Sequence, residues 1–288
     1  MAFELAKKVN AEIISIDSMK VYRRMNIGTA KPSKEVQKQV NYHLIDVVEP
    51  SESFSVDAFL SLTEQAVKDI ETKGKPVVAV GGTAMYIKAL LHGIFDGPST
   101  DDNIRRQLKQ QISELGLAEL HKKLTLVDPA AAERIHPNDE RRIIRALEVY
   151  ELTGKAISDF QQQFSAEPKD DWLVIGLQRE KTDASHRINN RVKKMFELGL
   201  VDEVKALLAE PKPLSMQARC AIGYAEIIDY LAGKETLENS IEQIKINTRR
   251  FAKAQRTWFK TFRFVNWLDI GKNDTAEQVL ERAMLYLR

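Results

Sequence analysis

The residue types best suited to chemistry lie close together between residues 17 and 32. Asp17 and Ser18 follow isoleucines at positions 13, 14 and 16, and such a β-branched run is typical of a buried parallel strand. Open α/β sheets bind ligands at the carboxyl ends of their strands, where this acid is expected. Asp followed by Ser is also a common helix N-cap, so a structural role stays open. The donors and turn residues that follow favour an anionic ligand: Tyr22, Arg23, Arg24, Gly28, Thr29, Lys31 and Pro32.

A second unit of strand, turn and helix carries Thr83. Residues 77–80 predict a buried strand, Gly81 and Gly82 a tight turn, and residues 84–91 a helix. Glycines at such a turn let the backbone approach a ligand, and the amino terminus of a helix favours an anion. A Gly-Gly-Thr turn can also be purely structural. The hydroxyl of Thr83 is the group that could orient a reactant here.

Two arginine clusters are candidate anion-binding surfaces. The first falls on or near one face of a helix predicted over residues 139–152: Arg141, Arg142 and Arg145. The second follows a strand predicted from Trp172 and enters a cation-rich helix interrupted at Gly199: Arg179, Arg187 and Arg191. Either cluster can instead be ordinary solvated surface. The second can also pair with carboxylates, for which the candidates are Glu180, Glu197 and Glu203.

A basic helix interleaved with aromatic residues is predicted over residues 247–262. Its cations are Arg249, Arg250, Lys253, Arg256 and Lys260, and its aromatic residues include Phe251, Trp258 and Phe259. Phosphate contacts combined with stacking on aromatic rings are the way in which proteins grip single-stranded RNA loops. An amphipathic basic helix packed on a core is the alternative. The lone cysteine, Cys220, has no Cys-His arrangement around it, so we interpret it as a small packing or backbone-contact residue.

Several of these motifs resemble the tRNA dimethylallyltransferase family, in the family's order and over nearly the whole chain. Residues 17–32 read DSMKVYRRMNIGTAKP, close to the family's DSMQVYRGMDIGTAKP, with Lys20 in place of Gln and Arg24 in place of Gly. GGTAMYIKAL resembles GGTGLYIKAL, with Ala84 in place of Gly. DPAAAERIHPNDERRIIRALEVYELTGK resembles the family throughout, and RFAKAQRTWFK resembles RFAKRQxTWFR.

The resemblance implies an α/β fold, a P-loop NTPase-like parallel sheet core with a helical insertion domain. The polar, turn-rich residues 96–102 mark a boundary, so we expect the core in residues 1–102 and 171–288 and the insertion, contacting tRNA, in 103–170. A further strand is expected over residues 42–50, and a helix after a cap at Ser55. In the family the helix expected at the start follows a strand and a phosphate-binding loop that this sequence lacks. We therefore expect a truncated start or an impaired variant.

The reaction that the resemblance implies is transfer of a dimethylallyl group from dimethylallyl diphosphate to N6 of an adenine beside the tRNA anticodon, with Mg²⁺ as cofactor. Asp17 and Thr83 are the expected catalytic residues. Arg179, Arg187 and Arg191 are the expected diphosphate ligands. The tRNA anticodon arm is expected to contact Asp17, Ser18, Met19, Lys20, Arg105, Arg141, Arg142, Ile143, Ile144, Arg145, Arg219, Cys220, Gly223, Tyr224, Arg249, Lys253 and Arg256. An adenylate isopentenyltransferase and a non-catalytic tRNA-binding relic remain the alternatives.

Composition limits these possibilities only loosely. With 43 Lys and Arg against 41 Asp and Glu, the net charge of the 288 residues is +2, so a nucleic-acid partner must rest on local clusters. One cysteine excludes an internal disulfide framework and fits a reducing compartment. No apolar run approaches 18 residues and no signal-peptide pattern is present, so we expect no membrane partner and a cytoplasmic location. We also expect a monomer.

Overall fold

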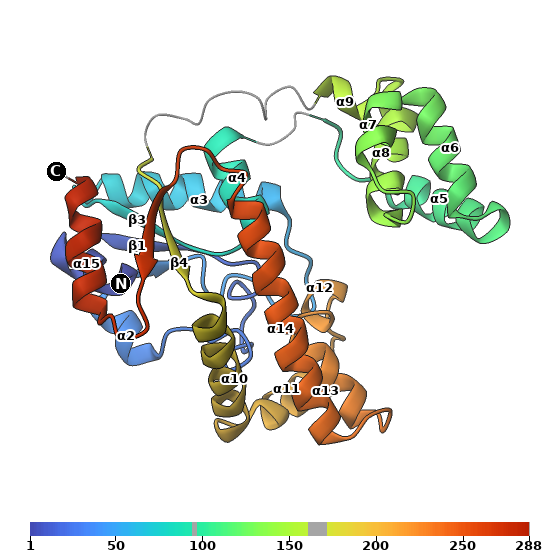
Figure 1. The fold of residues 1–288 in the computed structure, drawn as a ribbon. Helices are drawn as coiled ribbons and strands as arrows, with labels where there is room; N and C mark the ends of the chain where they lie inside the picture. The colour runs from blue at the N-terminus through green and yellow to red at the C-terminus, as the bar shows by residue number, and fades with distance from the viewer. Residues whose placement is uncertain (94–96, 161–171, 288) are drawn as a thin grey trace. The chain divides into compact units, whose positions relative to one another are not determined.

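The computed structural model describes residues 1–93, 97–160 and 172–287, and the chain divides into two compact units (Figure 1). The first unit contains residues 1–89 and 171–288, and the second contains residues 90–170. The helical unit begins earlier than the expected residue 103, because the stretch before it is hydrogen bonded into that unit. The Pro98 carbonyl accepts from Arg145 at 2.7 Å, and the Asp101 N–H donates to Glu148 at 2.8 Å.

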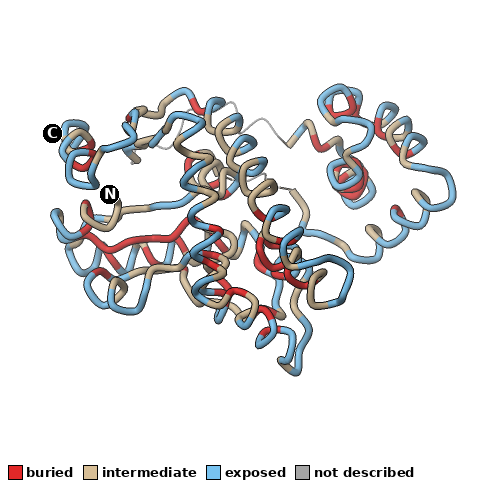
Figure 2. The backbone as a smooth tube through the Cα atoms, turned by 60° about the horizontal axis from the view of Figure 1, so that its bottom comes forward, coloured by how far each residue is buried: buried red, intermediate tan, exposed pale blue. Residues whose placement is uncertain are grey.

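A parallel sheet forms the centre of the first unit, which confirms the α/β expectation. Its strands are β1 (Glu12–Ile16), β2 (Tyr42–His43) and β3 (Val77–Gly81), in the order β2-β1-β3. Every residue of β1 is buried, so this strand lies in the core (Figure 2). The strand expected over residues 42–50 is only two residues long. Leu44 and Asp46 have φ of 61° and 57°, and this left-handed backbone ends the extended conformation.

Two more parallel strands, β4 (Ile175–Arg179) and β5 (Asn266–Ile270), pair with each other. The sequence predicted β4 but not β5, whose residues combine polar and aromatic types without clear alternation. Within the described residues, β3 is paired only with β1 and β4 only with β5. Val80 on β3 is 37% exposed and Leu177 on β4 is 43% exposed, so both strands present apolar side chains to solvent.

Helices surround these strands, and several begin and end where the sequence predicts. Ser55 caps α3 (Val56–Glu71) by accepting from the Ala58 N–H, and Gly199, with φ of 94°, separates α10 (Lys181–Glu197) from α11 (Leu200–Leu208). In Figure 1, α14 (Leu237–Phe259) runs beside α10 and α13 (Tyr224–Leu231). The other helices of the first unit are α1 (Ala2–Lys8), α2 (Lys34–Gln39), α12 (Met216–Arg219), α15 (Ala276–Met284) and the 3₁₀ helix η2 (Leu285–Leu287). Helix α4 (Ala84–His92) begins in the first unit and ends in the second.

The second unit is helical. It contains α5 (Asp102–Leu115), α6 (Leu117–Val127), α7 (Pro129–Arg134), α8 (Glu140–Thr153) and α9 (Ile157–Phe160). Asp101, Asp128 and Asp139 cap α5, α7 and α8 by accepting backbone N–H groups that have no partner within the helix. One apolar cluster from these helices forms its core. In the portion of the chain that the structure describes, no helix is both long and apolar enough to span a membrane.

Candidate active site

Asp17 lies directly after β1, at the carboxyl edge of the sheet. Its Oδ1 accepts the N–H groups of Met19 at 2.8 Å and Lys20 at 3.1 Å, so the carboxylate is held by its own turn. Residues 18–20 form a turn and no helix follows, so the helix-cap interpretation of Asp17 is wrong. No hydrogen bond from a described residue engages Oδ2. This half-buried carboxylate therefore keeps one oxygen available to accept a proton.

Thr83 lies beside this turn, because β1 and β3 end together. The Thr83 hydroxyl accepts the Ser18 N–H at 3.0 Å and donates to Ser18 Oγ at 3.4 Å. The N–H groups of Gly82 and Thr83 both donate to the Ile16 carbonyl, at 3.2 and 3.3 Å. A Cβ on Gly81 would lie 1.9 Å from that same carbonyl oxygen, so only glycine allows the two strand ends to approach this closely. The structure thus brings Asp17, Ser18 and Thr83 together.

Two cations face Asp17, one on the turn and one on α10. Desolvation by surrounding protein atoms lowers the pKa of Lys20, and the Asp17 carboxylate opposes this shift. Arg191 keeps solvent access, but protein atoms crowd its guanidinium and lower its pKa, again opposed by Asp17. Neither side chain forms an ion pair within 4 Å with any described residue. Both charges therefore remain available to an anionic ligand at this edge.

Arg179 and Arg187 are already engaged within the protein. Both pair with Asp183 at 3.1 Å, and they also donate to the carbonyls of Gly271 and Lys272, respectively, after β5. The carboxylates considered from the sequence were the wrong partners, because Asp183 lies four residues from each arginine, between Arg179 at the end of β4 and Arg187 on α10. These contacts join the start of α10 to the chain after β5. Of the three expected diphosphate ligands, only Arg191 faces the Asp17 edge with its charge uncommitted.

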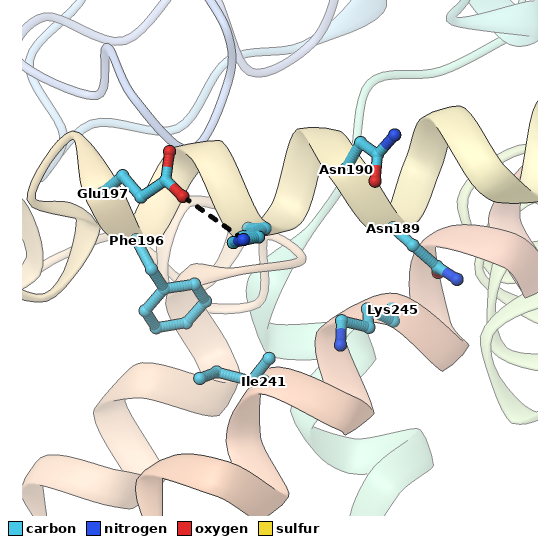
Figure 3. A pocket seen from close by; sticks show the side chains of 7 residues that line it. Asn189, Asn190, Phe196, Glu197, Ile241 and Lys245 are labelled. Carbon is cyan, nitrogen blue, oxygen red and sulfur yellow. Dashed lines mark ion pairs between the residues drawn. The ribbon is translucent and has the colours of Figure 1, made fainter.

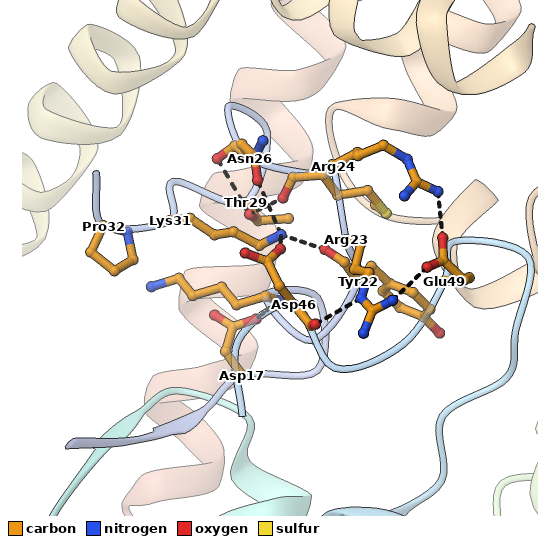
Figure 4. Close-up of polar contacts among 12 residues, drawn as sticks. Asp17, Tyr22, Arg23, Arg24, Asn26, Thr29, Lys31, Pro32, Asp46 and Glu49 are labelled. Carbon is orange, nitrogen blue, oxygen red and sulfur yellow. Dashed lines mark hydrogen bonds and ion pairs between the residues drawn. The ribbon is translucent and has the colours of Figure 1, made fainter. Parts of the chain in front are cut away.

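The arginines of the loop after Asp17 are likewise paired with carboxylates (Figure 4). Arg23 pairs with Glu49 at 2.8 Å, and Arg24 pairs with Glu49 at 2.5 Å and with Glu210 at 2.6 Å. Hydrogen bonds to Glu210 and then Glu49 raise the pKa of Arg24 above its usual range. Arg24 also has a left-handed φ of 62°, at the position where the resembled family has Gly. Both arginines therefore stabilise the loop rather than present free charge.

Lys31 is a buried anchor at the end of the same loop. Its ammonium donates to Asp46 at 2.7 Å, to Asn26 Oδ1 at 3.2 Å and to the Tyr22 carbonyl (Figure 4). Its side chain is only 3% exposed, and this burial lowers the pKa of Lys31 while Asp46 raises it. The sequence interpreted Lys31 as a donor for an anionic ligand. The structure instead uses it to close the loop.

Four expected tRNA contacts between residues 219 and 224 separate into exposed and buried pairs. Arg219 and Cys220 are exposed, which rules out the packing role considered for Cys220 and leaves the backbone-contact role. Gly223 and Tyr224 are buried, and the Tyr224 hydroxyl donates to Glu203 at 2.6 Å. Tyr224 is fully enclosed, so its side chain cannot reach an RNA. The burial of this ring was not predicted from the sequence, where Tyr224 follows the short run Cys220-Ala221-Ile222-Gly223.

Helix α14 reaches the catalytic edge through a residue that sequence reasoning missed. Gln255 donates to the Gly82 carbonyl at 2.7 Å, next to Thr83. The only sequence signal for Gln255 was the Gln in the family motif RFAKRQxTWFR, which this basic helix resembles. Arg249 is half-buried and donates to Asn189 at 2.6 Å, whereas Lys253 is exposed and Arg256 partly exposed. Phe251 is 53% exposed, so the predicted combination of charge and aromatic surface is present on α14.

A shallow pocket of about 320 Å³ lies between α10 and α14 (Figure 3). Its lining residues on α10 recur at helical spacing on the face opposite Arg191. The residues that line it are Asn189, Asn190, Lys193, Phe196, Glu197, Ile241 and Lys245. The pocket therefore belongs to a different surface from the catalytic edge.

In the second unit, only part of the expected RNA-binding set faces solvent. Ile143 and Ile144 are 0% and 5% exposed and lie in the apolar core, so their side chains are not RNA contacts. Arg105 and Arg145 donate to the fully buried Glu148, at 3.2 and 2.7 Å. A buried carboxylate requires such partners, which makes both arginines structural. The more exposed cations on α8 are Arg141 and Arg142.

The donor set at the Asp17 edge consists of oxygens. Within residues 1–93, 97–160 and 172–287, no group of three or more His, Cys, Asp or Glu side chains could hold a metal ion. The edge nevertheless offers the hydroxyls of Ser18 and Thr83 beside the Asp17 carboxylate. Mg²⁺ prefers oxygen ligands and usually keeps several waters, so the chemistry of this set fits a Mg²⁺ ion.

Comparisons with known proteins agree over nearly the whole chain. The model of the IPP transferase family matches residues 20–262. The tRNA dimethylallyltransferase of Geobacter metallireducens is 45% identical over 278 residues, which cover 96% of this chain and 90% of that protein. The tRNA dimethylallyltransferase of Thermotoga maritima is 44% identical over 275 residues, covering 95% and 89%.

Two solved structures resemble the fold. The tRNA isopentenylpyrophosphate transferase of Bacillus halodurans aligns with a TM-score of 0.72 and 40% identity, covering 99% of this chain and 90% of that chain. A eukaryotic dimethylallyltransferase acting on tRNA aligns with a TM-score of 0.81 and 28% identity, covering 98% and 73%. Both similarities extend over the sheet unit and the helical unit.

Proposed function

This chain belongs to the IPP transferase family, and we propose that it transfers the dimethylallyl group of dimethylallyl diphosphate to N6 of an adenine beside the tRNA anticodon. The observation that carries this proposal is the geometry of Asp17. Its carboxylate ends the central strand, its Oδ1 is fixed by two N–H groups, and its Oδ2 is open beside Thr83. Such a group is placed to accept one proton.

Proton acceptance matters because the exocyclic amine of adenine is a weak nucleophile. Its lone pair is delocalised into the ring, so the N–H becomes acidic only as the new C–N bond forms. In the proposed step N6 bonds to the terminal carbon of the dimethylallyl group, the bond from that carbon to diphosphate breaks, and the N6 proton moves to Asp17 Oδ2. Thr83 and Ser18 form the hydroxyl pair that would orient the amine.

The departing diphosphate needs positive charge. Arg191 is the arginine that we propose for this role, because its charge faces the Asp17 edge and is not consumed by an internal ion pair. Mg²⁺, held by diphosphate oxygens with water and a hydroxyl such as that of Ser18, would supply neutralisation of the leaving group. The adenine must leave its stack to reach this edge. We assign tRNA phosphate contacts to Arg141 and Arg142 in the second unit.

The first unit supplies the other proposed tRNA surface, on α14. Lys253 and Arg256 are three residues apart on one face of α14 and keep solvent access, which suits phosphate contact, and the exposed ring of Phe251 on the same helix could stack on a base. Gln255, between these cations, contacts the Gly82 carbonyl, so the same helix joins the RNA surface to the catalytic edge. This connection favours a macromolecular acceptor over a free nucleotide.

The decisive experiment supplies labelled dimethylallyl diphosphate and Mg²⁺ with either tRNA or free AMP. Label on tRNA, lost when the target adenine is replaced by guanine, supports the proposal. Label on AMP would assign an adenylate isopentenyltransferase instead. Tight tRNA binding with no label on either acceptor would assign a non-catalytic tRNA-binding protein.

A further inference from the structure

Glu203 on α11 is a carboxylate with no role in the proposed chemistry, yet it is one of the most completely hydrogen-bonded groups in the first unit. Its two oxygens accept three consecutive backbone N–H groups from the loop after Asp17. The donors are Asn26 at 2.9 Å, Ile27 at 2.8 and 3.1 Å, and Gly28 at 3.2 Å. Consecutive N–H groups that converge on one anion fix the backbone of a loop strongly.

Tyr224 on α13 completes this contact. Its hydroxyl donates to Glu203 Oε1 at 2.6 Å, and its ring is fully buried. Burial first, and the Glu203 carboxylate second, raise the pKa of Tyr224 well above its usual range, so the hydroxyl remains a donor. A Cβ on Gly28 would lie 2.4 Å from the Tyr224 ring, so the loop backbone rests directly on the ring. Glu203 and Tyr224 together form what we call the loop anchor.

A continuous set of hydrogen bonds joins the loop anchor to Asp17. The Lys31 N–H donates to the Asn26 carbonyl at 3.0 Å, and the Lys31 ammonium donates to Asp46 at 2.7 Å. The Asp46 N–H donates to the Lys20 carbonyl at 3.2 Å, and the Lys20 N–H donates to Asp17 Oδ1 at 3.1 Å. Displacing residues 26–28 therefore disturbs the turn that holds the carboxylate.

We propose that Glu203 and Tyr224 are positioning residues for the transfer reaction, which hold the loop so that Lys20 and the Asp17 turn keep the geometry that receives the adenine. This inference rests on the proposed function for its kinetic consequences. Neither residue contacts the reacting atoms in this arrangement. Their effect arises because a reactive group displaced by about 1 Å can lose about 10²-fold in rate.

The first test is Glu203→Gln, which replaces one carboxylate oxygen by an amide that faces N–H donors. The single-turnover rate should fall by about 10-fold to 10²-fold, and KM for tRNA should rise, while KM for dimethylallyl diphosphate stays within about twofold. Tyr224→Phe removes only the hydroxyl and should give a smaller loss in the same direction. Asp202→Asn is the matched control: it lies on the same turn of α11, is 84% exposed, and should leave all three constants unchanged.

A double-mutant cycle separates positioning from general destabilisation. If Glu203 acts through Asp17, adding Glu203→Gln to Asp17→Asn should cause less than about a twofold further loss of rate. Equal losses in both backgrounds would overturn the proposal, because a merely structural residue lowers the amount of folded enzyme in each. An unchanged rate for Glu203→Gln alone would overturn it as well.

Amide hydrogen exchange of the protein without substrates provides a readout that does not depend on turnover. Glu203→Gln should speed exchange at residues 26–28 and also at the N–H groups of Met19 and Lys20, with the helical second unit unaffected. Faster exchange at 26–28 but unchanged exchange at Met19 and Lys20 would refute the connection to Asp17. Absence of transfer by the unsubstituted protein, by contrast, would count against the proposed function alone.

Discussion

Replacing Asp17 by Asn separates the two roles of this carboxylate, because the structure assigns them to different oxygens. Oδ1 accepts the N–H groups of Met19 and Lys20, and the amide oxygen of Asn can accept the same two bonds. Oδ2 accepts no hydrogen bond from a described residue, and there Asn places an NH₂ group that cannot take a proton. We therefore expect the turn to survive and proton acceptance to be lost.

The magnitude follows from this division. General-base catalysis contributes about 10² to 10⁴ in rate, which corresponds to roughly 3 to 5 kcal/mol in the barrier. Stability should change by less than about 1 kcal/mol in Asp17→Asn, because both backbone bonds remain. Asp17→Ala should lose a similar factor in rate and in addition destabilise the protein by about 1 to 3 kcal/mol, since two partly buried N–H groups lose their acceptor.

Single-turnover kinetics with labelled dimethylallyl diphosphate and excess protein over tRNA would measure the rate, and urea unfolding would measure stability. Thr83→Ala is the matched control: it removes a hydroxyl at the same edge, so it should lose much less rate than Asp17→Asn. An undiminished rate in Asp17→Asn would refute the base assignment. A fall in tRNA affinity as large as the fall in rate would show that Asp17 serves binding instead.

Three further predictions concern charged groups that the structure separates by role. Arg142→Gln should flatten the salt dependence of tRNA binding by up to about one unit of log–log slope and leave stability unchanged. Arg145→Gln should instead lower the free energy of unfolding by about 3 kcal/mol, because it leaves the buried Glu148 short of a partner. Salt titrations of binding and urea unfolding distinguish the two variants. Glu12→Gln should destabilise by about 2 to 3 kcal/mol at pH 7, measured by urea unfolding. The difference from wild type should begin to shrink as pH falls below roughly 4 and should vanish only as pH reaches the lowered pKa of folded Glu12. Burial raises the pKa of folded Glu12, but hydrogen bonds from Asn41, His43, Lys73 and Lys75 leave the pKa lowered. The ionised carboxylate therefore stabilises the fold above the pKa of the unfolded chain, and this stabilisation is lost in acid. Arg24→Gly should change thermal stability little. Glycine relieves the left-handed backbone by about 1 kcal/mol, and this gain offsets the loss of exposed ion pairs worth a similar amount. A large loss of thermal stability would mean that those ion pairs hold the loop.

Local patterns were sufficient to predict much of the fold. Ser55, the Asp128-Pro129 pair and Gly199 each act on backbone within one turn of themselves, so their effects on helix ends are readable from neighbours alone. The β-branched run before Asp17 predicted its strand for the same reason. The family resemblance, carried by motifs along nearly the whole chain, is confirmed by the comparisons. What failed locally was the strand at 42–50, where left-handed residues interrupt an apolar run.

Tertiary structure alone decided which charges are free. Spacings of three or four residues already placed Glu148 near Arg145, and Asp183 near Arg179 and Arg187. Only the folded structure shows that Glu148 is fully buried and that carbonyls after β5 also hold Arg179 and Arg187. A periodic pattern reports which face a residue occupies, not whether its charge is neutralised.

The loop anchor is the clearest example of a contact that no local sequence pattern predicts. Glu203 and Tyr224 lie about 175 and 196 positions from Gly28, with which they make contact. In the sequence Glu203 is an ordinary charged helix residue and Tyr224 an ordinary aromatic one. Ion pairing and backbone anchoring depend on distances of about 3 Å between residues far apart in the chain, and the packing of α11 and α13 against the Asp17 loop sets those distances.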